Sequence, residues 1–249
     1  TAPYDRETDL TYWEEDPEAA VKALNTCYTY LGNMDEQLYC EAMTDNAYTK
    51  QPNDATQNIG NGSYSTADPY VKKVWDGRYT GIRMCNELLE NIDRVPDLDP
   101  ELKKRYIGEA KVLRAYNYYE LYTKFGDVPY TTKVLSIKES MSIARTAKAT
   151  VIANVLADLD EVINGNYLPT SYDADNKGRI TRWAAMAIKA KIYLFEGNWT
   201  QVKNITSTIM TEGGFKLFGS YAGLFEIANE YNSEVILDAQ YRPPSREHQ

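Results

Sequence analysis

Apolar residues return every three or four positions over most of this chain, which is the spacing of helices that bury one side. One such pattern spans about residues 70–94, and another over 99–125 stops at Gly126. We therefore predict a mostly α fold with long loops and few short strands. Further helices are predicted over about 16–31, 37–43, 146–164, 182–196 and 199–211.

The boundaries of these helices carry recognisable start and stop signals. An acidic N-cap followed by proline, which suits the first helical position, occurs at Asp16-Pro17, Asp68-Pro69 and Asp99-Pro100. Thr181 is expected to cap the helix that follows it, and Gly165 to end the helix before it. Short turns that contain such proline and glycine signals join the helices of antiparallel pairs. We therefore predict a series of such pairs, the last of which resembles a tetratricopeptide unit.

The helix predicted over 99–125 carries an arginine inside its apolar side. Because an unpaired buried charge costs several kcal/mol, Arg114 must find partners on neighbouring helices. We therefore predict that this helix is the structural centre of the fold, with Arg114 fixing the helices around it. Gly126 and Asp127 are expected to set the direction in which the chain leaves the helix. The residues predicted to share the buried side are Ile107, Ala110, Arg114, Tyr118, Leu121 and Phe125.

A polar stretch over 45–67 interrupts the helical pattern. Asn, Gln, Gly, Ser, Thr and Asp dominate it, and loops of this length are usually functional or disordered. Its isolated aromatic residues have polar neighbours, which makes them the best candidates for a binding surface. At Trp75, in the next helix, the spacing favours core packing at least as strongly as ligand binding. The candidate ligand-binding residues are Asp45, Tyr48, Tyr64, Tyr70, Trp75 and Arg78.

Both ends of the chain differ from its helical middle. Residues 1–15 are expected to form a polar N-terminal tether, and residues 131–144 to be irregular and extended. Residues 234–241 alternate in the manner of a single β-strand. Because a lone strand would leave an exposed edge, we expect one domain over 1–249 that is incomplete at its C-terminal end.

Composition excludes several classes of protein. The 249 residues suffice for one large domain or two small ones, and a hydrophobic share of 43 % suits a folded chain. The formal net charge of −9 argues against a nucleic-acid partner, because phosphate binding needs clustered Lys and Arg. The sequence has no run of about 18 apolar residues that could span a membrane. It also has no signal peptide, and Thr1 is not an initiator, so we expect a processed or trimmed chain.

The sequence offers no residue set for catalysis, and we predict neither a cofactor nor a metal ion. Its one histidine, His248, lies at the end of the chain, where a catalytic role is uncommon. The acids Asp158 and Asp160 are expected to be solvated rather than catalytic. One loop resembles the start of a calcium-binding EF-hand, but Lys177 and Ala184 occupy positions that need ligand oxygens. The three cysteines match no zinc pattern, so we expect buried or partly buried thiols.

A series of short motifs runs through nearly the whole chain in a characteristic order. Its most recognisable part is Leu113-Arg114-Ala115-Tyr116 followed by Phe125-Gly126-Asp127-Val128-Pro129. The other members are Tyr12-Trp13 with Asp16-Pro17-Glu18, then Trp75, Tyr79, Ile82 and Asn86, then Gly178-Arg179-Ile180-Thr181, Gly197-Asn198-Trp199 and Asn232-Ser233-Glu234-Val235-Ile236. This ordered series resembles the SusD/RagB family of outer-membrane nutrient-binding lipoproteins.

The resemblance implies a mostly α fold of tetratricopeptide-like helix pairs without catalytic activity. It implies a surface-exposed protein, anchored to the outer membrane by a lipid on a cysteine before Thr1, that captures oligosaccharides. It also implies a partner, a TonB-dependent SusC-like transporter that receives the oligosaccharide. Members of the family are typically much longer than this chain. Two alternatives remain open: peptide uptake of the RagB type, and a tetratricopeptide-like scaffold for protein interactions.

Overall fold

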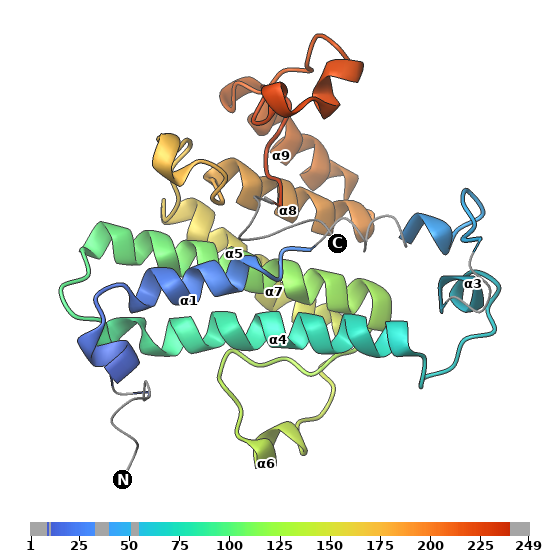
Figure 1. The fold of residues 1–249 in the computed structure, drawn as a ribbon, viewed down its shortest axis with the longest axis horizontal. Coiled ribbons are helices and arrows are strands. Elements are labelled where there is room, and N and C mark those ends of the chain that lie inside the picture. Colours follow the sequence, from blue (N-terminus) through green and yellow to red (C-terminus); the bar gives the residue numbers. More distant parts are fainter. Residues whose placement is uncertain (1–8, 10, 33–39, 51–54, 240–249) are drawn as a thin grey trace.

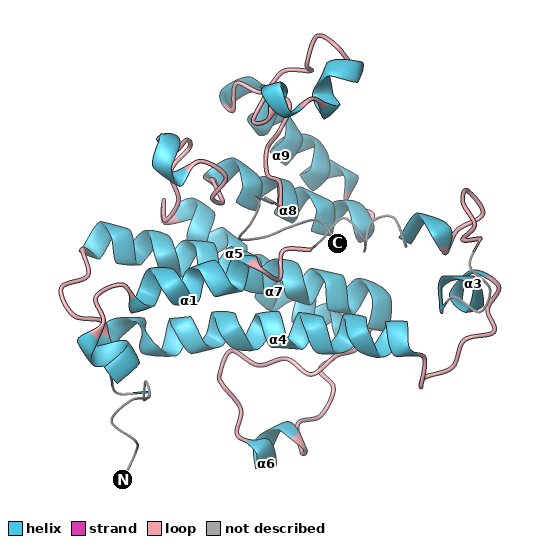
Figure 2. Cartoon of the chain, in the orientation of Figure 1, coloured by secondary structure: helices cyan, strands magenta, loops and turns pink. Residues whose placement is uncertain are grey.

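The computed structural model describes residues 9, 11–32, 40–50 and 55–239, and this part of the chain is almost entirely helical (Figure 1). Figure 2 shows no strand in it, and strand-like pairing in the described residues is limited to one antiparallel bridge between Val128 and Thr146. The predicted mostly α fold is confirmed. In chain order the elements are η1 (Thr11–Glu15), α1 (Ala19–Tyr28), α3 (Ala55–Gly60), α4 (Pro69–Asn91), η2 (Ile92–Arg94), α5 (Pro100–Phe125), α6 (Ile137–Ser140), α7 (Lys148–Asn164), η3 (Ala174–Asn176), α8 (Arg182–Phe195), α9 (Trp199–Glu212), η4 (Ala222–Phe225) and η5 (Ile227–Asn229).

Helix α5 is the centre of the packing, as its sequence predicts. It contacts α1, α4, α7 and α8, and the helices α8 and α9 pack on each other above this layer (Figure 1). The predicted apolar side is buried or half-buried, but Glu109 and Leu113 on other sides of α5 are buried as well. A helix surrounded by neighbours buries more than one stripe, so its hydrophobic pattern understates its burial.

Most of the predicted helix starts are confirmed by the capping hydrogen bonds. The carboxylates of Asp68 and Asp99 accept from the backbone N–H groups of Tyr70 and Leu102, both at 2.9 Å. The Thr181 hydroxyl accepts from the N–H of Ala184 at 3.3 Å.

The predicted end of α7 is confirmed, because the helix ends at Asn164 and the N–H of its C-cap Gly165 donates to the Glu161 carbonyl at 2.9 Å. Gly165 keeps a right-handed conformation with φ −78°, and Asn166 takes the left-handed conformation with φ 52°. Asparagine tolerates this conformation better than most residues, because its short polar side chain can hydrogen-bond locally.

The predicted N-terminal tether is wrong over its last residues. Residues 11–15 form the π-helix η1, and Trp13 in it is only 2 % exposed. Helix α1 starts at Ala19 rather than at the predicted Pro17. The Asp16 carboxylate accepts from the N–H of Glu18 at 2.9 Å, before the helix begins. The tether prediction for residues 1–8 and 10 lies outside the described residues. Burial of one tryptophan outweighs the polar composition around it, because an aromatic side chain removes a large apolar area from water.

Two long loops contain short helices that the sequence pattern does not predict. The polar stretch 45–67 holds α3, and the irregular stretch 131–144 holds α6. Helix α6 is stabilised by a capping box in which the Ser136 hydroxyl and the Glu139 carboxylate each accept from the other residue's backbone N–H. Of the helix predicted over 37–43, residues 40–42 are helical and Met43 is in a turn, while residues 37–39 lie outside the described residues.

The predicted strand over 234–241 is wrong over 234–239, which are irregular. A strand needs a neighbour for its backbone groups, and the described residues provide none there. Residues 240 and 241 lie outside the described residues.

The prediction for the cysteines is correct for two of the three. Cys27 and Cys85 are fully buried between α1 and α4, whereas Cys40 is exposed.

Candidate functional site

The polar stretch before α4 is folded back on itself by hydrogen bonds between its two halves. The side-chain amide of Gln57 donates to the Thr49 carbonyl at 2.6 Å, and the Thr49 and Thr56 hydroxyls lie 3.1 Å apart. A Cβ on Gly60 would lie 3.3 Å from the carbonyl oxygen of Met43, so the two backbones approach closely. Thr56 is buried, although the stretch contains few apolar side chains. The loop therefore holds a defined shape at the end of the molecule beside α3 (Figure 1).

Tyr48 and Tyr64 are the two aromatic side chains that this loop presents to solvent. Tyr48 is 77 % exposed and Tyr64 is 52 % exposed. Asp45 is exposed on the same loop, as its polar surroundings predict. Flat aromatic faces with amide and carboxylate groups nearby suit a ligand that has both C–H faces and hydroxyl groups. We call the surface formed by residues 40–50 and 55–68 the loop surface.

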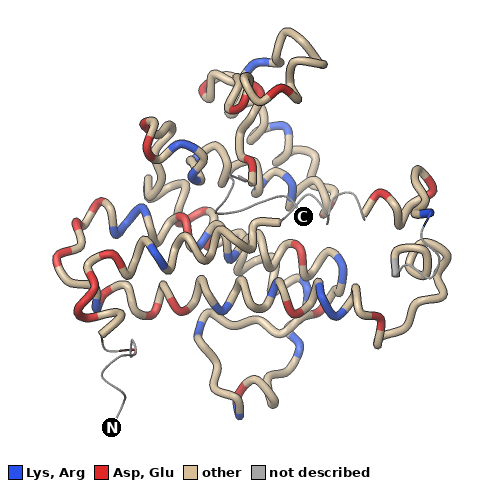
Figure 3. The backbone as a smooth tube through the Cα atoms, in the orientation of Figure 1, with Lys and Arg blue, Asp and Glu red and all other residues tan. Residues whose placement is uncertain are grey.

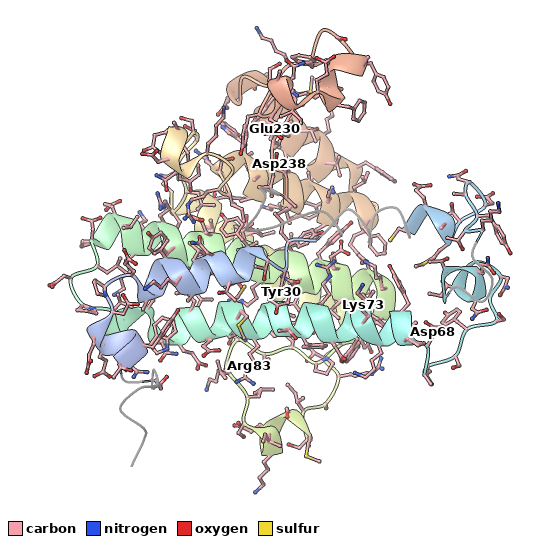
Figure 4. The ribbon with its side chains drawn as sticks, in the orientation of Figure 1. Tyr30, Asp68, Lys73, Arg83, Glu230 and Asp238 are labelled. Carbon is pink, nitrogen blue, oxygen red and sulfur yellow. The ribbon has the colours of Figure 1, made fainter. Side chains whose placement is uncertain are left out.

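Tyr70 lies at the border between the loop surface and α4. It is half-buried, and its hydroxyl lies 4.0 Å from the Cys40 sulfur. Figure 4 labels Asp68, the residue that caps α4 there and that is 8 % exposed. Tyr70 therefore borders the loop surface, with its ring partly covered.

Trp75 packs inside the helical layer rather than on the loop surface. Its ring centroid lies 5.0 Å from that of Phe125, with the planes at 90°, and 4.9 Å from that of Tyr79. The Arg145 guanidinium lies 5.9 Å from the Trp75 centroid on a further side. These contacts favour the core-packing interpretation of this residue.

Arg78 is buried, which argues against the predicted role in ligand binding. Its side chain donates to the Tyr30 carbonyl at 3.0 Å and lies 3.9 Å from the Glu120 carboxylate. The guanidinium also lies over the Tyr116 ring, 5.6 Å from its centroid. Figure 4 labels Tyr30, which follows α1, beside α4. Arg78 thus links α1, α4 and α5, and its location corrects the assignment made from the sequence.

Arg114 has partners on two neighbouring helices. Its Nη2 and Nε donate to Asp158 Oδ2 of α7 at 2.6 and 3.2 Å, and its Nη1 donates to Asn86 Oδ1 of α4 at 2.9 Å. Asn86 in turn donates to the carbonyls of Thr131 and Lys133. The expectation that Asp158 is a solvated charge is wrong, because it faces the buried arginine. Sequence spacing alone does not indicate which helix α7 faces.

Gly126 and Asp127 determine how the chain passes from α5 to α7. Gly126 has φ 70°, a conformation that favours glycine, and it ends α5. The Asp127 carboxylate accepts from the N–H of Lys148 at 2.8 Å. Helix α7 has no cap from its own preceding residue Ala147, so Asp127 caps it from a distant position in the chain.

A buried carboxylate network is the main polar feature that the sequence does not predict. Glu109 of α5 has no exposed surface, and its carboxylate accepts a 2.6 Å hydrogen bond from the Tyr28 hydroxyl. Arg105 and Arg179 contact the same carboxylate at 3.2 and 3.3 Å, and the Tyr172 hydroxyl lies 3.4 Å away. Burial raises the pKa of Glu109, although these partners lower it. The only sequence signal for the network is an acid within a helix whose neighbouring positions are apolar.

Basic and acidic residues are interspersed along α4 and α5, whereas α8 carries Arg182, Lys189 and Lys191 and no acidic residue (Figure 3). Within the described residues, no group of three or more His, Cys, Asp or Glu side chains could hold a metal ion. In the same part of the chain, every helix is too short or too polar to cross a membrane.

Comparison with known proteins identifies the family. A family model described as starch-binding and associating with the outer membrane matches residues 18–194, which include α1, α4, α5 and α7. A SusD-like protein of Formosa agariphila is 30 % identical to 90 % of this chain, which corresponds to 47 % of that protein. The matched part of the chain thus covers 47 % of this relative and 34 % of a SusD-like protein of Bacteroides ovatus, which is between about a third and a half of their lengths.

Solved structures give the same result. A SusD-like protein of Bacteroides fragilis superposes with a TM-score of 0.85 at 27 % identity, covering 98 % of this chain and 48 % of that one. A SusD-like protein described as laminarin-binding gives a TM-score of 0.80 at 28 % identity, covering 88 % of this chain and 50 % of the other. A surface glycan-binding protein of Bacteroides thetaiotaomicron, solved with laminarihexaose, shares the fold at a TM-score of 0.78 and 21 % identity, over 90 % of this chain and 49 % of that protein. The chain therefore belongs to the SusD-like family of starch-binding proteins that associate with the outer membrane.

Proposed function

We propose that this chain belongs to a non-catalytic cell-surface protein that captures oligosaccharides on the loop surface and passes them to a TonB-dependent SusC-like transporter. The observation that carries the proposal is the exposure of Tyr48 and Tyr64, at 77 % and 52 %, on a loop held in shape by its own hydrogen bonds. A pre-shaped loop loses little conformational entropy when a ligand binds.

The chemistry of the loop surface suits a sugar. Tyr48 and Tyr64 offer aromatic faces to the C–H faces of pyranose rings, while Asp45 and the loop amides can accept and donate hydrogen bonds to hydroxyl groups. An aromatic contact contributes roughly 0.5–1.5 kcal/mol beyond the buried area, and a net hydrogen bond about 1 kcal/mol. Two aromatic contacts with a few hydrogen bonds give a dissociation constant in roughly the micromolar-to-millimolar range. Binding of this strength suits a protein that must release its ligand again.

The relatives indicate which ligand to test first. One SusD-like structure at 28 % identity is described as laminarin-binding, and the family description names starch. Laminarin-type and starch-type glucans are therefore the first probes. We propose that neither cofactor nor metal ion takes part.

The partner and location are part of the same proposal. We place the protein on the outer-membrane surface, held by a lipid anchor outside this chain, beside the SusC-like transporter. Exposed large hydrophobic side chains on α9 and the segment after it support contact with another protein. They are Trp199, Met210, Leu217, Tyr221, Phe225 and Ile227. The same surface supports the alternative of a tetratricopeptide-like interaction scaffold, and peptide capture of the RagB type would use the loop surface with a different ligand.

Calorimetry with a ligand panel tests the proposal. The panel consists of laminarihexaose, maltohexaose and a mixture of short peptides. We expect binding of at least one hexasaccharide and no release of shorter sugars. Binding of the peptides alone would favour the RagB-type alternative, and binding of neither class would contradict ligand capture. Co-purification of a transporter barrel from native membranes tests the partner separately.

A further inference from the structure

A second cleft lies away from the loop surface, between the end of α1, the loop over residues 170–181 and the segment 231–239. It consists of two adjoining hollows of about 240 and 330 Å³. Both hollows are lined by Lys177, Gly178, Arg179 and Asp238, so they lie side by side. Figure 4 shows Asp238 above Tyr30 and below Glu230, well separated from α3 and the loop surface. Small-molecule sites typically occupy about 300–1,000 Å³, so the cleft is large enough for a ligand.

The floor of the cleft is rigid. The Tyr28 hydroxyl donates to the buried Glu109 carboxylate at 2.6 Å and accepts from the N–H of Ile180 at 2.8 Å. Arg179 contacts Glu109 at 3.3 Å and donates to the Asn25 side chain at 3.2 Å. These bonds fix the 170–181 loop to α1 and α5. The Glu109 network, which the loop surface does not use, thus shapes this cleft.

The wall of the larger hollow carries three half-buried aromatic residues, Tyr172, Phe215 and Tyr231. Tyr231 has φ 58°, a left-handed conformation that bulky side chains rarely adopt. The Lys177 ammonium lies 4.5 Å from the centre of its ring. Strained backbone of this kind concentrates at functional sites, where it holds a side chain in a required place.

The charges around the cleft indicate the class of ligand. Two carboxylates, Asp175 and Asp238, stand against two cationic side chains, Lys177 and Arg179, and Arg179 already contacts Glu109. The carboxylates would repel an anionic ligand, and the lysine and arginine would repel a cationic one. A neutral ligand rich in hydroxyl groups avoids both conflicts, because carboxylates accept from hydroxyls while amides and ammonium groups donate to them. Its C–H faces would pack on the aromatic wall.

We propose that this cleft binds a short neutral oligosaccharide, as a second site separate from the loop surface. The inference rests on the proposed function, because it assigns the same class of ligand. A protein with two separate sites holds one glycan chain more strongly than either site alone, provided that the chain reaches both.

Chemical footprinting of Lys177 and calorimetry test the cleft directly. In wild-type protein with laminarihexaose or maltohexaose, we expect slower acetylation of Lys177, read by mass spectrometry, and unchanged acetylation of Lys203, which is exposed on α9. Tyr231→Gly removes the ring and also relieves the left-handed strain, so the fold is retained. This variant should bind at the cleft roughly 2- to 12-fold more weakly, whereas Tyr48→Ala/Tyr64→Ala should leave the protection of Lys177 intact.

The outcomes separate the two proposals. Binding that depends on Tyr48 and Tyr64, without protection of Lys177 and without an effect of Tyr231→Gly, overturns the cleft and leaves the loop surface standing. Protection of Lys177 with no effect of Tyr48→Ala/Tyr64→Ala on the measured affinity supports the cleft and contradicts the loop surface. Absence of any binding by the folded wild-type protein overturns both.

Discussion

Replacing Arg114 by methionine tests the structural role of the buried arginine. The side chains of Arg114 and Asp158 are 5 % and 16 % exposed, and three hydrogen bonds hold the guanidinium to Asp158 and Asn86. Breaking a buried ion pair by removing one partner costs about 3–5 kcal/mol, because a charge is left uncompensated. Lys111 lies 3.8 Å from Asp158 and partly compensates it, so we expect the lower end, about 3 kcal/mol.

Urea denaturation measures this loss as a lower free energy of unfolding. With a denaturant slope of about 3 kcal/mol per molar, the midpoint should fall by about 1 M. Arg114→Lys keeps the charge but loses the paired geometry, and it should cost less than Arg114→Met. Arg114→Met/Asp158→Leu leaves no buried charge of this pair and should be more stable than Arg114→Met alone. The reasoning is refuted if Arg114→Met lies within about 1 kcal/mol of the wild type, or if the double variant is the less stable one.

Substitutions at Glu109 and Asp127 test the buried carboxylate network and the cap of α7. Burial raises the pKa of Glu109 above its ordinary value of 4.5, so its contribution to stability is fully present below pH 4.5 and is lost as the pH rises through its folded-state pKa. The difference in unfolding free energy between wild type and Glu109→Gln should therefore fall with rising pH in urea titrations, and a difference that grows would contradict it. Asp127→Ala removes the carboxylate that caps α7 at the N–H of Lys148, and it should lower the free energy of unfolding by about 1 kcal/mol in urea denaturation. Asp127→Asn, which keeps an acceptor, should cost less, and equal losses in the two variants would argue against the cap.

The helices of this fold are largely predictable from the sequence because their ends are marked. Asp68 and Asp99 cap α4 and α5 as predicted, and Gly126 ends α5 with a positive φ. These signals act locally, within a few residues of each helix end, so a single sequence contains them. The first helix shows the limit, because the same Asp-Pro signal at Asp16 is followed by α1 only from Ala19.

Contacts between distant residues are the part that the sequence does not predict. Asp158 is the partner of Arg114 across 44 positions, and Tyr28 is the partner of Glu109 across 81. Their spacing along the chain carries no information about which helices face each other. The predicted strand is absent over 234–239 for a related reason, since alternation indicates a strand only where a neighbouring strand exists.

The candidate site was predictable where exposure follows from local composition. Tyr48 and Tyr64 have polar neighbours and are exposed. Trp75 and Arg78 lie in a helix, where the side that faces a neighbour depends on the whole fold. Arg78 proved to be buried against Tyr30, and Trp75 packs against Phe125. Within the candidate set, the sequence therefore predicts the exposure of loop residues better than the exposure of helix residues.

Measuring glycan binding by the double variant Tyr48→Ala/Tyr64→Ala tests most directly the claim that the protein captures oligosaccharides on the loop surface. Two aromatic contacts are worth about 1–3 kcal/mol together, so the dissociation constant for the hexasaccharide that the wild type binds should rise roughly 5- to 150-fold in calorimetry. The matched control is Tyr221→Ala, which removes a tyrosine that is 80 % exposed but lies outside the loop surface, and it should bind as the wild type does. A dissociation constant unchanged in the double variant, or changed equally in the control, would contradict capture on the loop surface.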